Sequence, residues 1–383
     1  MTPPRGRIPV AHPVLSGNER RYVDECIDTA WISSVGRFIQ AFETEFARYI
    51  STPHALSCCN GTVALHLALL GIGCGPGDEV IVPTLTYIAS ANAVTYCGAT
   101  PVFVDVDPRT FNLDPVQVES RITPRTKAIM AVHLYGHPAD MDPLAELAAR
   151  HDLALIEDAA ESHGALYKGR KTGSIGEVGV FSFFGNKIVT TGEGGMLTTA
   201  NADLAMRMKL LRGQGMDLQR RYWFPIVGYN YRMTNIEAAI GLAQLERIDE
   251  HLAARQRVRR WYDERLRDLS DLIQLPIEEP WARHSFWMYT IILSDAVVAG
   301  ITRDEFMARL DADGIETRPV FYPMHVLPPY LDPAARFPVA DRLAAQGVNL
   351  PTHGMLTEDD VDYIVSRIRA SLQQASVALP RRA

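Results

Sequence analysis

Apolar residues recur in short runs through the first two-thirds of the chain, and segments with helical spacing separate them. The runs contain many β-branched residues and are bounded by Gly, Pro or Asp, which is typical of buried strands. They lie at residues 80–83, 102–105, 127–133, 154–158 and 178–183, and the helical segments lie at 62–70, 88–96 and 143–150. This alternation predicts an α/β fold with a mostly parallel sheet covered on both faces.

The pattern changes at Asn235, where one long helical stretch runs through Asp249 toward Leu266. Beyond it, residues 286–293 and 316–321 are predicted as strands, and residues 303–311 and 358–372 as helices. These elements predict a smaller α+β unit. Because 383 residues are too many for one compact unit, we predict a large domain of residues 1–250 and a small C-terminal domain of residues 251–383.

Composition excludes several classes of function. The formal charge is −7 and no basic run occurs, which argues against a nucleic-acid partner. The sequence has no stretch of about 18 uninterrupted apolar residues, so no membrane span is expected. The segment Met1 to Pro9 lacks the apolar part of a signal peptide. The 5 cysteines include no Cys-x-x-Cys pair, so neither a disulfide framework nor a metal site is expected. A cytoplasmic protein is predicted.

Lys187 follows a predicted strand, in a segment crowded with glycine and threonine. Ligands of parallel sheets bind beyond the carboxyl ends of the strands. Glycine allows close approach of a ligand, and Ser182 offers a hydroxyl to a phosphate. A partly desolvated lysine loses proton affinity and can attack an aldehyde, which gives a Schiff base. For Lys187 alone, a surface lysine in a polar turn is the commoner interpretation.

Asp158 closes another predicted strand, so it also lies where ligands bind. A carboxylate there could pair with a protonated pyridine nitrogen. Capping of a helix N-terminus is an equally good interpretation, because Asp suits that position. Glu161, one turn further on, could face the same pocket or solvate the start of a helix.

Three further segments carry weaker signals. Asn60-Gly61-Thr62 precedes a predicted helix and could bind an anion there, although ordinary capping is common. Tyr87 follows a strand end and could stack on a flat heteroaromatic ring or lie in the core. Polar and aromatic residues alternate from Gly228 to Asn235, which capping explains in part. Together, an anion site, a ring clamp, a pyridinium partner and a lysine are what pyridoxal 5'-phosphate requires.

The order of these motifs resembles the DegT–DnrJ–StrS family of sugar aminotransferases, which has the aspartate-aminotransferase-like fold, or fold type I. The resemblance covers essentially the whole chain, from Trp31 to Pro351. The matching motifs are Asn60-Gly61-Thr62, Thr86-Tyr87, Glu157-Asp158-Ala159-Ala160, Ser182 with Lys187, and Gly228-Tyr229-Asn230-Tyr231-Arg232-Met233-Thr234. Some relatives carry His in place of the lysine and are dehydratases, so the retained Lys187 favours transamination.

The resemblance implies a role for each matching residue. Lys187 would bond to pyridoxal 5'-phosphate and carry the proton between substrate and cofactor. Asp158 would pair with the pyridine nitrogen, Tyr87 would stack on the ring, and Glu161 would lie near its oxygen edge. The remaining cofactor-binding candidates are Gly61, Thr62 and Ser182 at the phosphate, Asn186 beside the lysine, and Asn230 from a neighbouring subunit. Because Asn230 would act in trans, a homodimer or higher homo-oligomer with shared sites is expected.

The resemblance also implies the reaction. L-glutamate would donate an amino group to C4 of a nucleotide-linked 4-keto-6-deoxy sugar, in O-antigen or lipopolysaccharide biosynthesis. Residues 85–92, 184–187, 211–216 and 221–225 are most similar to members that act on GDP-4-keto-6-deoxymannose. Candidates for lining the sugar's path are Trp31, Ser33, Ser34, His163, Tyr322 and His325, each of which could instead be structural.

Other functions remain open at this point. The acceptor could be a dTDP- or UDP-linked keto sugar or a cyclitol ketone. The same fold also hosts decarboxylases and lyases, and a regulatory protein could keep the cofactor site without turnover.

Overall fold

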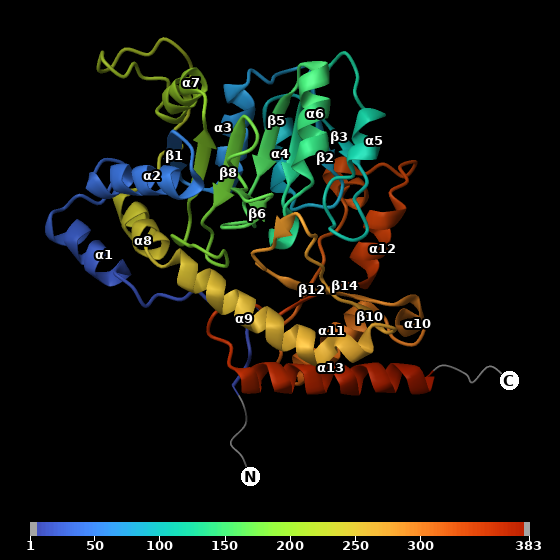
Figure 1. Cartoon of the computed structure of the whole chain (residues 1–383). Helices are drawn as coiled ribbons and strands as arrows, with labels where there is room; N and C mark the ends of the chain where they lie inside the picture. Colours follow the sequence, from blue (N-terminus) through green and yellow to red (C-terminus); the bar gives the residue numbers. More distant parts are fainter. Residues whose placement is uncertain (1–5, 379–383) are drawn as a thin grey trace.

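The computed structural model describes residues 6–378, so residues 1–5 of the segment considered for a signal peptide lie outside it (Figure 1). A seven-stranded sheet has the order β1-β9-β8-β5-β4-β2-β3. Its strands are β1 (His54–Cys58), β2 (Glu79–Pro83), β3 (Thr100–Val104), β4 (Thr126–Val132), β5 (Ala154–Asp158), β8 (Val178–Ser182) and β9 (Gly195–Thr199). β9 runs antiparallel to both of its neighbours, β1 and β8, and all the other pairs of this sheet are parallel. The predicted α/β fold with a mostly parallel sheet is confirmed.

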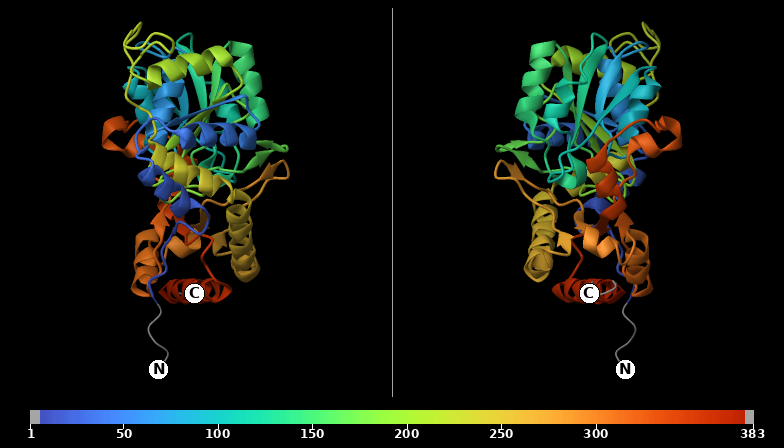
Figure 2. Two further views of the ribbon diagram at one scale, coloured as in Figure 1. Left: turned by 90° about the vertical axis from the view of Figure 1, so that its left-hand side faces the viewer. Right: turned by 90° about the vertical axis from the view of Figure 1, so that its right-hand side faces the viewer.

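Helices cover both faces of this sheet (Figure 2). Because side chains alternate along a strand, Val80 and Val82 pack with α3 (Gly61–Gly71), α4 (Ala89–Tyr96) and α7 (Ala202–Arg212). Ile81, between them, packs on the opposite face with α5 (Pro115–Glu119) and α6 (Met141–His151). Further along that face, α2 (Arg37–Ile50) and α8 (Asn235–Leu245) pack on Phe181 and Phe183, and α1 (Glu19–Asp28) lies against α8.

The prediction of one long helix from Asn235 to Leu266 is wrong, because the chain breaks into α8 and α9 (Ile248–Leu266). Arg247 has φ −119° between them. The N-terminal segment crosses here: Gln244 donates to the carbonyl of Val14 at 2.8 Å, and Arg247 donates to the carbonyl of Ser16 at 2.7 Å. These tertiary contacts outweigh the helical pattern of the sequence. From the break, α9 runs away from the large sheet (Figure 1).

A second sheet lies below the first in Figure 1, with the strand order β10-β12-β14-β13. Its strands are β10 (Ile273–Gln274), β12 (Tyr289–Leu293), β14 (Gly347–Leu350) and β13 (Arg318–Pro319), and it shares a core with α9, α10 (Asp295–Val298), α11 (Arg303–Ala312) and α13 (Glu358–Ala378). Pro338–Gln346 forms α12, and β6 (Leu166–Tyr167), β7 (Arg170–Lys171) and β11 (Ala282–Arg283) form a small third sheet. The division into domains 1–250 and 251–383 stays a prediction, and its boundary falls in the first turn of α9.

Two predicted strands of this part are shorter than expected. The strand predicted from residue 286 begins only at Tyr289, because Phe286 has φ 50°, outside the β region. The strand predicted at residues 316–321 pairs only over Arg318–Pro319. Val320 still donates to the carbonyl of Gly347 at 3.1 Å, but the Gly347 amide bonds to the carbonyl of Leu343 at the end of α12 and not back to this strand. Within residues 6–378, no helix is long and apolar enough to cross a membrane, and the 5 cysteines are free.

Candidate active site

Lys187 lies in the turn after β8, and its ammonium group faces a carboxylate. The Nζ atom donates to Oε1 of Glu161 at 3.4 Å, and the side chains are only 11% and 6% exposed. The other oxygen of Glu161 accepts the amide of Tyr135 at 2.9 Å. Tyr135 has φ 54°, a strained conformation for a bulky residue, in the turn that points this amide at the carboxylate.

Burial shifts both members of this pair toward their neutral forms. It lowers the pKa of Lys187, and the charges of Glu161 and Asp158 oppose that shift. Burial likewise raises the pKa of Glu161, against the charge of Lys187 and the Tyr135 amide. A lysine with a lowered pKa is closer to the unprotonated amine that attacks a carbonyl carbon.

Asp158 ends β5 on the face of the sheet covered by α4. Its Oδ2 accepts the hydroxyl of Ser90 at 2.8 Å, and the Ser90 hydroxyl contacts Thr86 Oγ1 at 3.0 Å. Its Oδ1 has one weaker donor, the Ala160 amide at 3.2 Å. Burial raises the pKa of Asp158, while the Ser90 hydrogen bond, the Ala160 amide and the charge of Lys187 oppose the rise. A nearby cation would therefore be needed to stabilise this carboxylate fully.

The first turn of α3 packs closely against the end of β8. The Asn60 side chain caps the helix by accepting the amide of Val63 at 3.0 Å. A Cβ atom on Gly61 would lie 2.7 Å from Cβ of Ser182, so only glycine allows this approach. The leading amides of a helix have no partner within it and can bind an anion, and the Ser182 hydroxyl lies close to Gly61, the first residue of α3.

Trp287 lies against Lys187 although it follows residue 250. Its ring centroid is 3.8 Å from Lys187 Nζ, and its indole N–H donates to the carbonyl of Asn186 at 2.8 Å. The side-chain oxygen of Asn186 is buried without a partner among the described residues. Arg255 donates to the Trp287 carbonyl at 2.9 Å. The lysine therefore lies between Glu161 and an aromatic face.

Tyr87 and Asn230 are both exposed. Tyr87 follows β2, and its ring centroid is 5.7 Å from that of Phe321. Asn230 lies in an extended segment between Tyr229 and Tyr231, whose rings stack at 4.8 Å and pack on the core formed with α3. Because side chains alternate along an extended chain, Asn230 points away from that core.

The candidates for the sugar's path do not share one environment. The carbonyls of Trp31 and Ser33 accept from the side-chain amide and the backbone amide of Asn235, each at 2.7 Å, so the segment with Ser34 is tied to the start of α8. Trp31 is exposed, as is Tyr322.

The two histidines among these candidates are buried. His325 contacts Thr84 Oγ1 through Nδ1 at 3.0 Å and Asp341 through Nε2 at 3.1 Å, so both ring nitrogens have partners. His163 lies beside Phe181 and Phe183 with ring centroids 5.5 and 5.7 Å away. Burial lowers the pKa of His163 to about 3, with the charge of Lys187 adding to the shift. His325, with both ring nitrogens bonded, therefore fits a structural role.

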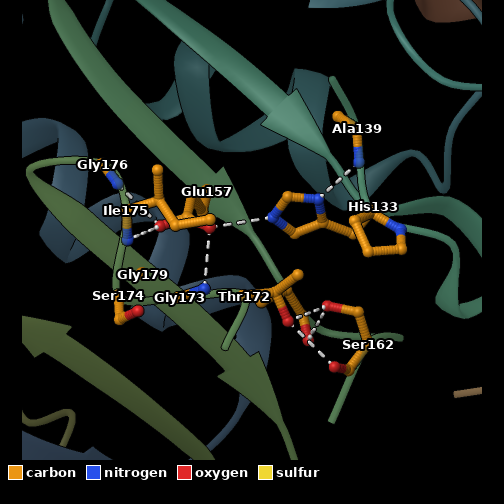
Figure 3. A network of polar contacts seen from close by, with 12 residues as sticks. His133, Ala139, Glu157, Ser162, Thr172, Gly173, Ser174, Ile175, Gly176 and Gly179 are labelled. Atoms are coloured by element: carbon orange, nitrogen blue, oxygen red, sulfur yellow. Dashed lines mark hydrogen bonds and ion pairs between the residues drawn. The ribbon is translucent and has the colours of Figure 1, made fainter. Parts of the chain in front are cut away.

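Glu157, which precedes Asp158, points to the opposite face of β5 and lies in a dense hydrogen-bond network (Figure 3). It accepts from Nε2 of His133 at 3.0 Å and from the amides of Gly173, Ile175 and Gly176 at 2.7, 2.6 and 2.7 Å. Burial alone would raise its pKa, but the His133 hydrogen bond and these amides leave the pKa of Glu157 lowered.

Residues 13–369 match the model of the DegT/DnrJ/EryC1/StrS aminotransferase family. The chain belongs to this family. It is 62% identical to GDP-perosamine synthase of Caulobacter vibrioides over 94% of this chain and 97% of that protein. It is 48% identical to GDP-perosamine synthase of Escherichia coli O157:H7, over 94% and 97%. The solved structure of DesI in the presence of its TDP-sugar product has a TM-score of 0.90 and 34% identity, over 97% of this chain and 95% of DesI.

Membership confirms the predicted fold type and the predicted enzyme class. DegT/DnrJ/EryC1/StrS aminotransferases depend on pyridoxal 5'-phosphate, so this is the cofactor of the chain. The residues present fit it. A buried carboxylate with an incompletely bonded oxygen, Asp158, suits a pyridinium nitrogen, and the Gly61 approach to Ser182 suits a phosphate.

Ser90 and Trp287 are the site residues that the sequence analysis missed. Ser90 lies three residues after Tyr87 and is the second residue of α4, and its place just after the strand end could have indicated it. No local signal points to Trp287, because it contacts Lys187 only through packing between two segments that lie 100 residues apart in the sequence.

Proposed function

We propose that this aminotransferase moves the amino group of L-glutamate to C4 of GDP-4-keto-6-deoxymannose and so produces GDP-perosamine. The observation that carries the proposal is the 62% identity to the GDP-perosamine synthase of C. vibrioides across almost the whole chain. The structure is compatible with it, because Lys187, Glu161 and Asp158 form a buried cluster suited to proton transfer.

The chain's own residues would divide the work as follows. Pyridoxal phosphate, when bound, carries the amino group and accepts electrons from the deprotonated substrate carbon. Asp158 would keep the pyridine nitrogen protonated. Lys187 would remove and return the proton at the reacting carbon, with a lowered pKa that lets its amine accept that proton and release it again. Glu161, which holds Nζ, would orient the lysine between these transfers.

The remaining cofactor contacts are proposed on their positions. Gly61, Thr62 and Ser182 would hold the phosphate, at the N-terminus of an eleven-residue helix. Tyr87 would stack on the cofactor ring. Its exposed side chain follows β2, which lies beside β4 in the sheet, and β4 lies beside β5. Asn186 would contribute its unpartnered side-chain oxygen.

Asn230 would complete the phosphate site of a second subunit. It is exposed and points away from its own core, as a residue acting in trans must. The preceding segment exposes several large apolar side chains to solvent, which is typical of a surface buried in an oligomer. These are Tyr222, Trp223, Phe224, Ile226 and Val227. We therefore propose a homodimer or higher homo-oligomer. On the proposed reaction, we place the enzyme in the cytoplasm, where it would supply O-antigen or lipopolysaccharide biosynthesis.

The sugar path stays a proposal. Trp31, Ser33 and Ser34 lie beside the start of α8, near the segment that carries Asn230, and Tyr322 is exposed near the end of β13. His163 and His325 are buried, so they would support the residues that line the path and would not contact the sugar from an open surface.

A panel of 4-keto-6-deoxy sugars on GDP, dTDP and UDP tests the substrate, with each amino-sugar product identified by mass. We expect the highest kcat/KM for the GDP sugar with L-glutamate as donor. A higher value for a dTDP or UDP sugar would contradict the proposal. Loss of the absorbance of the lysine-bound cofactor on adding glutamate alone would separate an aminotransferase from a non-catalytic cofactor-binding protein.

Borohydride reduction followed by peptide mapping tests the lysine. The pyridoxyl label should be on Lys187, and Lys187→Ala should be a folded protein without turnover. A label on another lysine would contradict the assignment.

A further inference from the structure

Trp287 makes two contacts with the segment that carries the reactive lysine. Its ring face lies 3.8 Å from Lys187 Nζ, well within the range of a cation–π interaction. Its indole N–H donates to the backbone carbonyl of Asn186, the preceding residue, at 2.8 Å. One side chain thus holds both the head group of the lysine and the backbone from which the lysine extends.

The indole is itself held firmly. It is only 4% exposed, and it stacks on Tyr135 with a centroid distance of 6.2 Å and an interplanar angle of 25°. The Trp287 carbonyl accepts from buried Arg255 at 2.9 Å, and the amide of Met288 donates to the carbonyl of Tyr135 at 3.3 Å. Tyr135 also presents its amide to Glu161. The two groups on either side of the lysine therefore share one support.

A lysine side chain has a flexible four-carbon stem and a compact charge. Without a fixed partner, its amine would sample many positions in the pocket. Glu161 restrains Nζ from one direction at 3.4 Å, and the Trp287 ring restrains it from another at 3.8 Å. In a site closed to water, an aromatic face stabilises a positive charge more than it does at the surface.

We propose that Trp287 is a positioning residue for Lys187: its ring and its indole N–H hold the amine where it can bond to the cofactor and exchange protons. The proposal deepens the proposed function, since it assigns a further residue to the same reaction. Because a fixed amine reacts as if it were highly concentrated, loss of the ring weakens the bond between lysine and cofactor.

The test compares two forms of the cofactor that differ in their dependence on the lysine. The aldehyde of pyridoxal phosphate would condense with the Lys187 amine with loss of one water molecule, whereas pyridoxamine phosphate has no aldehyde and cannot. We expect Trp287→Leu to weaken the affinity of the apoenzyme for pyridoxal phosphate by about tenfold, because the amine loses the fixed position from which it reacts. Its affinity for pyridoxamine phosphate should stay at the wild-type value. Equilibrium dialysis of the full chain measures both.

Trp281→Leu is the matched control, because Trp281 also lies beyond residue 250 but contacts His137 and Tyr167. Trp281→Leu should not change the ratio between the affinities for pyridoxal phosphate and pyridoxamine phosphate. Equal losses for both cofactor forms in Trp287→Leu, or no loss, would overturn the proposal. If Trp287→Leu does not fold, Trp287→Phe decides: it keeps a weaker ring face without the N–H donor, so a smaller but still selective loss is expected, and an unselective one overturns the proposal.

Proton transfer gives a second measurement. With 2-deuterated glutamate, Trp287→Phe should show a larger isotope effect on the first half-reaction than the wild type, because a misplaced amine slows the proton step. An unchanged isotope effect would contradict the positioning role. The cofactor measurements involve no sugar, so failure of the GDP-sugar proposal in the substrate panel and failure of the Trp287 proposal are separate outcomes.

Discussion

Glu157 and Asp158 are consecutive carboxylates at the end of β5, both buried, and their surroundings differ in one respect. Glu157 accepts four hydrogen bonds: one from His133 and three from backbone amides. Asp158 accepts two, from Ser90 and Ala160. The pKa is lowered for Glu157 and raised for Asp158, although burial pushes both upward.

The difference would separate a structural carboxylate, Glu157, from one that acts in the proposed reaction, Asp158. His133 accepts the Ala139 amide at Nδ1 at 3.0 Å, so Nε2 carries the proton and donates to Glu157. Every group in that network has its partner, and it fixes the loop of residues 173–176 to the sheet (Figure 3). Asp158 accepts only two hydrogen bonds, so its carboxylate can still bind a cation. Strand alternation alone places the two carboxylates on opposite faces, so one dipeptide serves both purposes.

The largest expected effect of an acid-to-amide change is on catalysis at Asp158. Asp158→Asn should lower turnover about a thousandfold, because removing one partner of a buried charge pair costs about 3–5 kcal/mol. Its melting temperature without cofactor should not fall below the wild-type value at neutral pH. Stopped-flow absorbance measures both half-reactions. Near wild-type rates in both would mean that Asp158 only caps the turn that follows β5.

The same change at Glu157 should instead lower stability. A glutamine turns a donor group toward amides or His133 that now lack an acceptor, so Glu157→Gln should cost about 3 kcal/mol of unfolding free energy. Denaturant unfolding of the apoenzyme measures it, with Asp158→Asn as the control of identical chemistry. Activity per folded molecule should fall less than in Asp158→Asn. A larger loss of activity than of stability would make Glu157 part of the reaction.

The two carboxylates should also respond oppositely to pH. The folded pKa of Glu157 is lowered, so its contribution to stability is present above the ordinary value of about 4.3 and is lost as pH falls through the folded pKa. The stability gap between wild type and Glu157→Gln should therefore narrow in acid. The folded pKa of Asp158 is raised, so its contribution is present in acid and is lost as pH rises through that pKa. The stability of apo Asp158→Asn should increase relative to that of the apo wild type as pH rises. Melting curves from pH 7 to pH 4 test both trends.

The sequence was most informative where one local pattern decides the structure. The five predicted strands of the large sheet and the helices between them agree with the structure within two residues at each end. Asp158 and Lys187 could be found because strand ends are ligand positions in such sheets. The break at Arg247 could not be predicted, because the side chains of Gln244 and Arg247 meet the backbone carbonyls of residues 14 and 16 only in the fold. The burial of His163 and His325 could not be predicted either, since a polar residue carries no mark of its burial in the sequence.

The smallest effect is expected at Ser90, whose hydroxyl bonds to one oxygen of Asp158 at 2.8 Å and to Thr86 Oγ1 at 3.0 Å. This bond lowers the pKa of Asp158 against the effect of burial. Ser90→Ala removes the bond, so the pKa of Asp158 should rise further, and a hydrogen bond to a charged group contributes about 1.5–3 kcal/mol. Because a bound pyridinium would compensate part of that loss, we expect about a tenfold fall in turnover, or about 1.4 kcal/mol.

Ser90→Thr, which keeps the hydroxyl, is the matched control and should recover most of the rate. The pH at which the cofactor's absorbance changes should shift in Ser90→Ala and return in Ser90→Thr, since the charge of Asp158 acts on the ring directly. A general loss of packing would lower the rate of both variants and leave that pH unchanged. In that case, the two hydrogen bonds of Asp158 would be as structural as the four of Glu157, and the difference between the neighbouring carboxylates would rest on the cofactor alone.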